Sequence, residues 1–191
     1  MISEQTRSRI AKARDSFPHR RSAILPSLYA IQEEVGHLSE EGIDAIAEVL
    51  DLHANDVFQV ASFYSLVHTD PWGKYLVEVC INLPCALRGA DTLAQYVQAK
   101  LGLSGGGDDH EAQGGTTGDG MFTFRPTIEC LAACSFAPMM QVNQRYFENL
   151  TQEKVDQIFE QLRGLAARYP DGPVPGTEIG KLSYATERVQ Q

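Results

Sequence analysis

Residues 75–85, YLVEVCINLPC, mark the point where the pattern of this chain changes from helical to strand-like. Apolar side chains occupy alternate positions from Tyr75 to Val79, the spacing that is typical of a short β-strand. Cys80 follows at the carboxyl end of this predicted strand, and Cys85 comes next in a loop. The stretch therefore predicts a strand that delivers two thiols to one end of a sheet.

The chain has four cysteines, and the other two form a second close pair, Cys130 and Cys134 in ECLAAC. This pair also follows a predicted strand, which begins at Phe122. Loops that follow strands at one end of a sheet can converge. We therefore predict one site with four thiolates. Four inert buried cysteines are the alternative, but they would leave the pairing unexplained.

Composition limits the kinds of function. The 191 residues have a formal net charge of -9 and are 43% hydrophobic, which is typical of a globular protein. The basic residues are scattered, so the chain is not expected to bind nucleic acid. The polar start, MISEQTRSRI, is unlike a signal peptide, and no run of about 18 apolar residues predicts membrane insertion. We expect a cytoplasmic protein, in which paired cysteines favour ligation over disulfides.

Residues 1–72 are predicted to form an N-terminal helical domain. After a polar helix around residues 3–16, apolar residues recur with helical spacing before Gly36 and again after Ser39, a residue suited to cap a helix. Each apolar stripe must pack against the others, as in a small helical bundle. The turn residues PWGK at 71–74 indicate a boundary.

Residues 73–165 are predicted to form an α/β (α+β) domain in the order β-α-β-β-α. Its small mixed sheet has four strands, two of them in a hairpin within residues 139–150, with flanking helices. Thr151 is expected to cap the last helix and Gly164 to stop it. The glycine-rich residues 104–120 lack a phosphate-binding fingerprint and are expected to form a surface loop. Residues 166–191 are expected to be an extended C-terminal tail.

The spacing of the cysteines leaves two metal centres open. Structural zinc and a [2Fe-2S] cluster both accept four thiolates, and gaps wider than the zinc knuckle favour the cluster modestly. A Rieske centre needs two histidines, and all five histidines of the chain lie outside the cysteine loops. Neither pair has the C-x-x-C spacing of a thioredoxin dithiol.

Five stretches carry a resemblance to a known family. They are RSAILPSLYAIQEEVGHLS, VASFYSLV, GKYLVEVCINLPCALRGA, GDGMFTF and ECLAACSFAPMMQVN, and they lie between about residues 17 and 163. Together they resemble the thioredoxin-like [2Fe-2S] ferredoxin family, and within it the E subunits of bacterial NADH:quinone oxidoreductase (respiratory complex I). The resemblance implies a helical extension followed by a thioredoxin-like domain.

The resemblance also implies a function. Cys80, Cys85, Cys130 and Cys134 would ligate one [2Fe-2S] cluster, and none of the residues would be catalytic. The chain would be a one-electron-transfer subunit of an NADH dehydrogenase, on the cytoplasmic peripheral arm of a membrane-bound complex. FMN and NADH would bind to a partner flavoprotein, and a further iron–sulfur subunit would belong to the same complex.

Other hosts and one other class stay open at this point. Related subunits serve NAD-reducing hydrogenases and NAD-dependent formate dehydrogenases, and a zinc-stabilised interaction module is a candidate without redox chemistry.

Two local features also follow from the resemblance. The family often has glycine where this chain has Ala132, and Pro138 resembles a proline that is often cis beside the active loop of thioredoxin-like folds.

Overall fold

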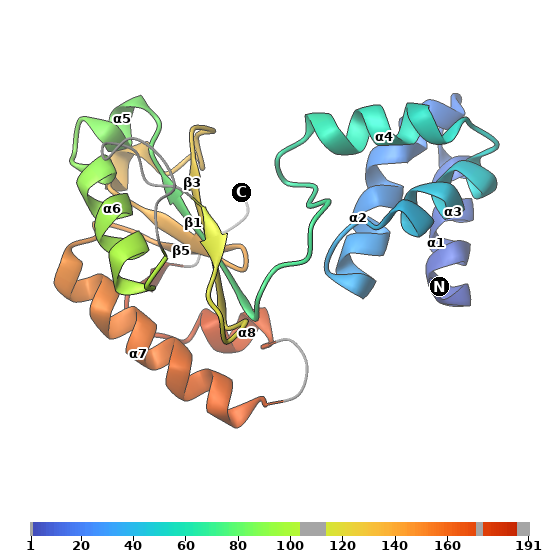
Figure 1. Ribbon diagram of the computed structural model, residues 1–191. Helices are drawn as coiled ribbons and strands as arrows, with labels where there is room; N and C mark the ends of the chain where they lie inside the picture. Colours follow the sequence, from blue (N-terminus) through green and yellow to red (C-terminus); the bar gives the residue numbers. More distant parts are fainter. Residues whose placement is uncertain (1, 104–113, 171–173, 187–191) are drawn as a thin grey trace. The chain divides into compact units, whose positions relative to one another are not determined.

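The computed structural model describes residues 2–103, 114–170 and 174–186 (Figure 1). Contacts divide the chain into two compact units, Met1–Pro71 and Trp72–Gln191. Within the described ranges, every helix is too short or too polar to cross a membrane. The sequence-based prediction of a surface loop at residues 104–120 lies outside the described residues for 104–113; in the described remainder, Gly115–Thr116 form a short strand instead of loop.

The first unit is helical. It contains α1 (Glu4–Ser16), a 3₁₀ turn (Arg20–Ala23), α2 (Ile24–Val35), α3 (Glu40–Leu50) and α4 (Ala54–Phe63).

Local signals explain where these helices begin and end. The Ser39 side chain accepts a hydrogen bond from the Gly42 N–H and so caps α3. Gly36 ends α2 with φ of +92°, in the left-handed region that glycine enters without strain. The apolar stripes meet in one core, which includes Ile10, Leu28, Ile31, Ile46, Leu50 and Val57.

The second unit contains a mixed sheet. Its strands are β1 (Tyr75–Cys80), β2 (Gly115–Thr116), β3 (Phe122–Thr127), β4 (Met140–Val142), β5 (Arg145–Phe147) and β6 (Ala185–Thr186). Their order across the sheet is β2-β3-β1-β4-β5-β6, with β1 and β3 parallel and the other neighbours antiparallel.

The four expected strands form the centre of this sheet, and the prediction of a mixed sheet is confirmed. In the described residues β2 and β6 extend it to six strands. These two edge strands have only two residues each, too few for an alternating pattern to reveal them.

The helices of the second unit are α5 (Leu83–Ala86), α6 (Ala90–Lys100), α7 (Gln152–Arg168) and α8 (Gly176–Ile179), with a 3₁₀ turn at Cys134–Phe136. Helices α6 and α7 pack on the same core as the sheet.

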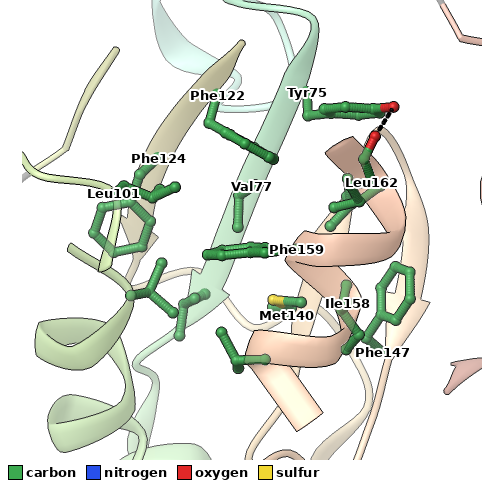
Figure 2. Packing of buried hydrophobic residues seen from close by; sticks show 14 of the residues in the cluster. Tyr75, Val77, Leu101, Phe122, Phe124, Met140, Phe147, Ile158, Phe159 and Leu162 are labelled. Carbon is green, nitrogen blue, oxygen red and sulfur yellow. Dashed lines mark hydrogen bonds between the residues drawn. The ribbon is translucent and has the colours of Figure 1, made fainter. Parts of the chain in front are cut away.

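Aromatic rings hold β1, β3 and α7 together, as Figure 2 shows. The centroid of the Phe122 ring lies 5.5 Å from that of Tyr75 and 5.2 Å from that of Phe159. The buried Tyr75 hydroxyl donates to the carbonyl of Leu162, 2.8 Å away. Burial raises the pKa of Tyr75 to about 12, which keeps the phenol in its donor form. This core makes β1 a rigid support for Cys80.

Two expectations for the C-terminal part are wrong. Gly164 does not stop α7, which continues to Arg168 because Leu165 and Ala166 extend its buried stripe. The tail is not simply extended: Val174 and Ile179 are buried in the sheet core, and β6 pairs with β5. Tertiary packing orders the described part of this segment, although its sequence has little periodicity.

Candidate metal centre

The carboxyl ends of β1 and β3 lie at one edge of the sheet and carry both cysteine loops. The two strands are parallel, and Cys80 and Thr127, the last residue of each, are partners in the register. Cys85 follows β1 in α5, while Cys130 and Cys134 lie between β3 and β4. The topology thus brings four residues from distant parts of the sequence to one edge.

The first pair is buried. Cys80 and Cys85 are each 2% exposed, and the Cys85 N–H donates to the Asn82 carbonyl at the start of α5. The pKa of Cys85 is raised to about 12, mainly by burial and to a smaller extent by the hydrogen bond with Cys80. A thiol in this position ionises only when something compensates the buried charge, which a bound metal does.

The second pair is exposed and closely spaced. The Sγ atoms of Cys130 and Cys134 lie 3.2 Å apart, and the Ala132 N–H donates to Cys130 Sγ over 3.3 Å. The pKa of Cys130 is lowered mainly by the hydrogen bond with Cys134 and to a smaller extent by the one from Ala132. The hydrogen bond between the two thiols raises the pKa of Cys134. Cys130 is therefore the member of the pair that more readily becomes a thiolate.

The two pairs also interact with each other. The thiol of Cys80 lies 3.9 Å from the carbonyl oxygen of Glu129, which precedes the second pair. The charge of Cys134 contributes to the raised pKa of Cys85. One small apolar cluster surrounds the site; it contains Cys80, Cys85, Ala90, Ala133, Ala137 and Met139.

The turn that carries the second pair has two notable backbone features. Ala132 has φ of +59°, the left-handed region that favours glycine, which accounts for the glycine expected there from the family. The peptide bond between Ala137 and Pro138 is cis, as the resemblance predicted. The backbone of Met139, which follows it, partly offsets the rise in the pKa of Cys85.

The four thiols of the site come as two pairs. In the described part of the chain, no three or more His, Cys, Asp or Glu side chains are grouped so that they could hold a metal ion. Structural zinc needs four ligands around one point, whereas a [2Fe-2S] cluster shares four thiolates between two irons. Two thiol pairs that follow neighbouring parallel strands, with a backbone N–H directed at a sulfur, fit such a two-iron group.

Sequence reasoning missed other residues of the site. Leu83, Leu87, Ile128 and Phe136 are large, apolar and between 46% and 79% exposed. Each stands two residues from one of the four cysteines, a spacing that could have revealed them. These four exposed apolar side chains, which flank the cysteines in the sequence, are called the rim below. Asn82 was also missed; its side chain joins the two loops.

Comparisons with known proteins agree with this geometry. The family model for thioredoxin-like [2Fe-2S] ferredoxin matches residues 10–163. Over 157 residues the chain is 38% identical to an E subunit of the NADH-quinone oxidoreductase of Rhizobium meliloti (strain 1021), covering 82% of this chain and 88% of the relative. It is also 38% identical over 159 residues to the E subunit of the NADH-quinone oxidoreductase of Mycobacterium bovis, covering 83% of this chain and 60% of the relative.

A solved structure shares the fold. The chain resembles an NAD+-reducing [NiFe]-hydrogenase in the air-oxidized state, with a TM-score of 0.60 and 18% sequence identity over 74% of this chain and 23% of the hydrogenase chain. At that identity the likeness concerns the fold alone. The family model spans most of the chain, including both cysteine pairs. The chain therefore belongs to the thioredoxin-like [2Fe-2S] ferredoxin family.

Proposed function

We propose that this chain is the one-electron-transfer subunit of an NADH:quinone oxidoreductase and that Cys80, Cys85, Cys130 and Cys134 hold one [2Fe-2S] cluster. The observation that carries the proposal is that two thiol pairs, one buried and one exposed, follow the carboxyl ends of the neighbouring parallel strands β1 and β3. When bound, such a cluster accepts and returns single electrons. The protein residues supply its ligands, its orientation and its surroundings.

The two pairs have different tasks in this proposal. Cys80 and Cys85 anchor the site in the apolar core next to β1 and exclude water from that side. Cys130 and Cys134 face solvent, so the cluster would lie close to the surface, where electrons can pass to and from another protein. The Ala132 N–H directed at Cys130 favours the thiolate and stabilises negative charge at that sulfur.

The exposed rim of Leu83, Leu87, Ile128 and Phe136 supports a partner at this edge. Exposed apolar groups gathered at one place mark interaction surfaces. We propose that the rim docks against a flavoprotein that carries FMN and the NADH site. A further iron–sulfur subunit would complete the module, on the cytoplasmic peripheral arm of the complex. The similarity to E subunits of two bacterial NADH-quinone oxidoreductases supports this host.

The test begins with the isolated chain, purified without oxygen. We expect about two irons and two acid-labile sulfides per chain, and an EPR signal of a reduced [2Fe-2S] cluster after addition of dithionite. A colourless protein that contains zinc and no iron would instead identify a zinc-stabilised interaction module.

The host is tested in cells that produce the chain with an affinity tag. Co-purification with a flavoprotein and quinone-reducing membrane subunits is expected for NADH:quinone oxidoreductase. Co-purification with hydrogenase or formate dehydrogenase subunits would assign the chain to the equivalent NAD-linked module of those enzymes and contradict the host proposed here.

A further inference from the structure

The two cysteine loops stay joined beyond the end of the strands that carry them. The β1–β3 register ends at Cys80 and Thr127. One residue later the Ile81 N–H donates to the Thr127 carbonyl over 2.9 Å. At the next residue the link is made by a side chain instead of the backbone, since Asn82 Nδ2 donates to the Ile128 carbonyl over 2.6 Å.

Asn82 makes hydrogen bonds within the first cysteine loop and to the second one. It stands at the N-cap of α5, yet its side chain makes no capping hydrogen bond there. Its carbonyl accepts from the N–H groups of Cys85 and Ala86, each over 2.9 Å. The backbone of Asn82 thus orders the turn that carries Cys85, while its side chain fixes Ile128, two residues before Cys130.

The second loop is also held by other contacts: the Cys80 thiol lies 3.9 Å from the Glu129 carbonyl, and the Asn149 N–H donates to the Phe136 carbonyl over 2.8 Å. Cys130 and Cys134 are exposed. The loop contributes buried Ala133 and Ala137 and partly buried Leu131 to the apolar cluster at the site. Burial of such small side chains contributes little to holding a loop in register. Hydrogen bonds between the loops therefore contribute to setting the distance between the two thiol pairs.

We propose that Asn82 is a positioning residue that holds the Cys130–Cys134 loop at the correct distance from Cys80 and Cys85. This proposal rests on the function proposed above, because a two-iron group needs both thiol pairs at a set separation. Asn82 acts through Ile128 and Cys85 and does not itself need to touch the cluster. Its amide N–H is the required group, because it is the donor to the Ile128 carbonyl.

The first measurement uses the full chain without metal, so that it does not depend on cluster binding. Hydrogen exchange of the backbone in residues 129–136 is compared among the wild type, Asn82→Ala and Thr92→Ala. Loss of one hydrogen bond should speed exchange of this segment by about twofold to tenfold in Asn82→Ala. Thr92→Ala removes an exposed side chain of α6 and should leave the exchange unchanged. Unchanged exchange in Asn82→Ala would overturn the proposal.

The second measurement uses the chain with its cluster bound. Asn82→Asp keeps the size of the side chain but replaces the N–H donor with an acceptor, so it should resemble Asn82→Ala. We expect both variants to lose iron to a chelator several-fold faster than the wild type and to show altered g values after reduction, while Thr92→Ala behaves as the wild type. Wild-type g values and iron loss in both Asn82 variants would refute the positioning role. A wild-type chain that binds no iron would refute the proposed function instead, and the exchange experiment would still test the bond between Asn82 and Ile128.

Discussion

The Sγ atoms of Cys130 and Cys134 lie 3.2 Å apart because the chain turns between them at Ala132, whose φ is +59°. The same turn directs the Ala132 N–H at Cys130 Sγ. A residue with a side chain thus occupies a conformation that costs roughly 1–2 kcal/mol for L-amino acids. The turn that forms the second thiol pair is therefore under local strain.

Ala132→Gly should relieve this strain. We expect the free energy of unfolding, measured by denaturant titration of the chain, to rise by up to about 1 kcal/mol, because glycine adopts positive φ without steric cost. The matched control is Ala133→Gly. Ala133 is 2% exposed with φ of -118°, so glycine there loses packing and should lower stability. Equal effects of the two changes would contradict this account.

Removal of one thiol from either pair should abolish the cluster. In Cys80→Ala and Cys130→Ala we expect loss of iron and of the visible absorption, because a [2Fe-2S] centre needs both pairs of ligands. Iron analysis and absorption spectra of freshly purified chains check this. Ser135→Ala, a change beside Cys134 that removes no thiol, should keep the iron. Full iron content in either cysteine variant would count against the ligand assignment.

A polar contact between α6 and α7 should depend on pH. Asp156 accepts a hydrogen bond from the Tyr96 hydroxyl over 2.6 Å and pairs with Lys100 over 2.9 Å. These contacts, the Tyr96 bond first, lower the pKa of Asp156 below its ordinary value of 3.8. Its contribution to stability is thus present above about pH 4 and is lost as the pH falls through the lowered pKa.

Asp156→Asn should therefore lower the free energy of unfolding at pH 6 by less than about 1 kcal/mol, as for other surface contacts. At pH 2 the difference from the wild type should be smaller than at pH 6, because acidification protonates the wild-type carboxyl. Denaturant titrations at both pH values check this. Asp44→Asn makes the same change at an exposed position of α3 and serves as the control. A difference that grows on acidification would contradict the predicted sign.

The C-terminal segment should contribute to the stability of the second unit. Ile179 on α8 is fully buried in the sheet core, so Ile179→Ala should lower the free energy of unfolding by about 2–5 kcal/mol. Ile128→Ala makes the same chemical change at a side chain that is 74% exposed, and its effect should stay within about 0.5 kcal/mol. Similar losses in both variants would show that α8 is not packed as described.

Much of the local structure could be predicted from short-range signals. Ser39 and Thr151 cap α3 and α7 as expected, and Gly36 ends α2. Caps and apolar stripes depend on residues within about two turns of each other, so one sequence contains all the information needed. The pairing of the cysteines is equally visible, because each pair lies within one loop.

Only the tertiary structure decided the features that depend on distant residues. Gly164 stays inside α7 because the burial of Leu165 offsets the helical cost of glycine, roughly 1 kcal/mol. The strand β6 forms because β5 offers an edge for pairing. The bond from Asn82 to Ile128 spans 46 positions of the sequence. The sequence by itself determined the chemistry of the site, four thiols in two pairs, because residue type and spacing are local properties. Folding alone decided how those pairs are placed relative to each other, because their distance is set by strand register and packing across the sheet.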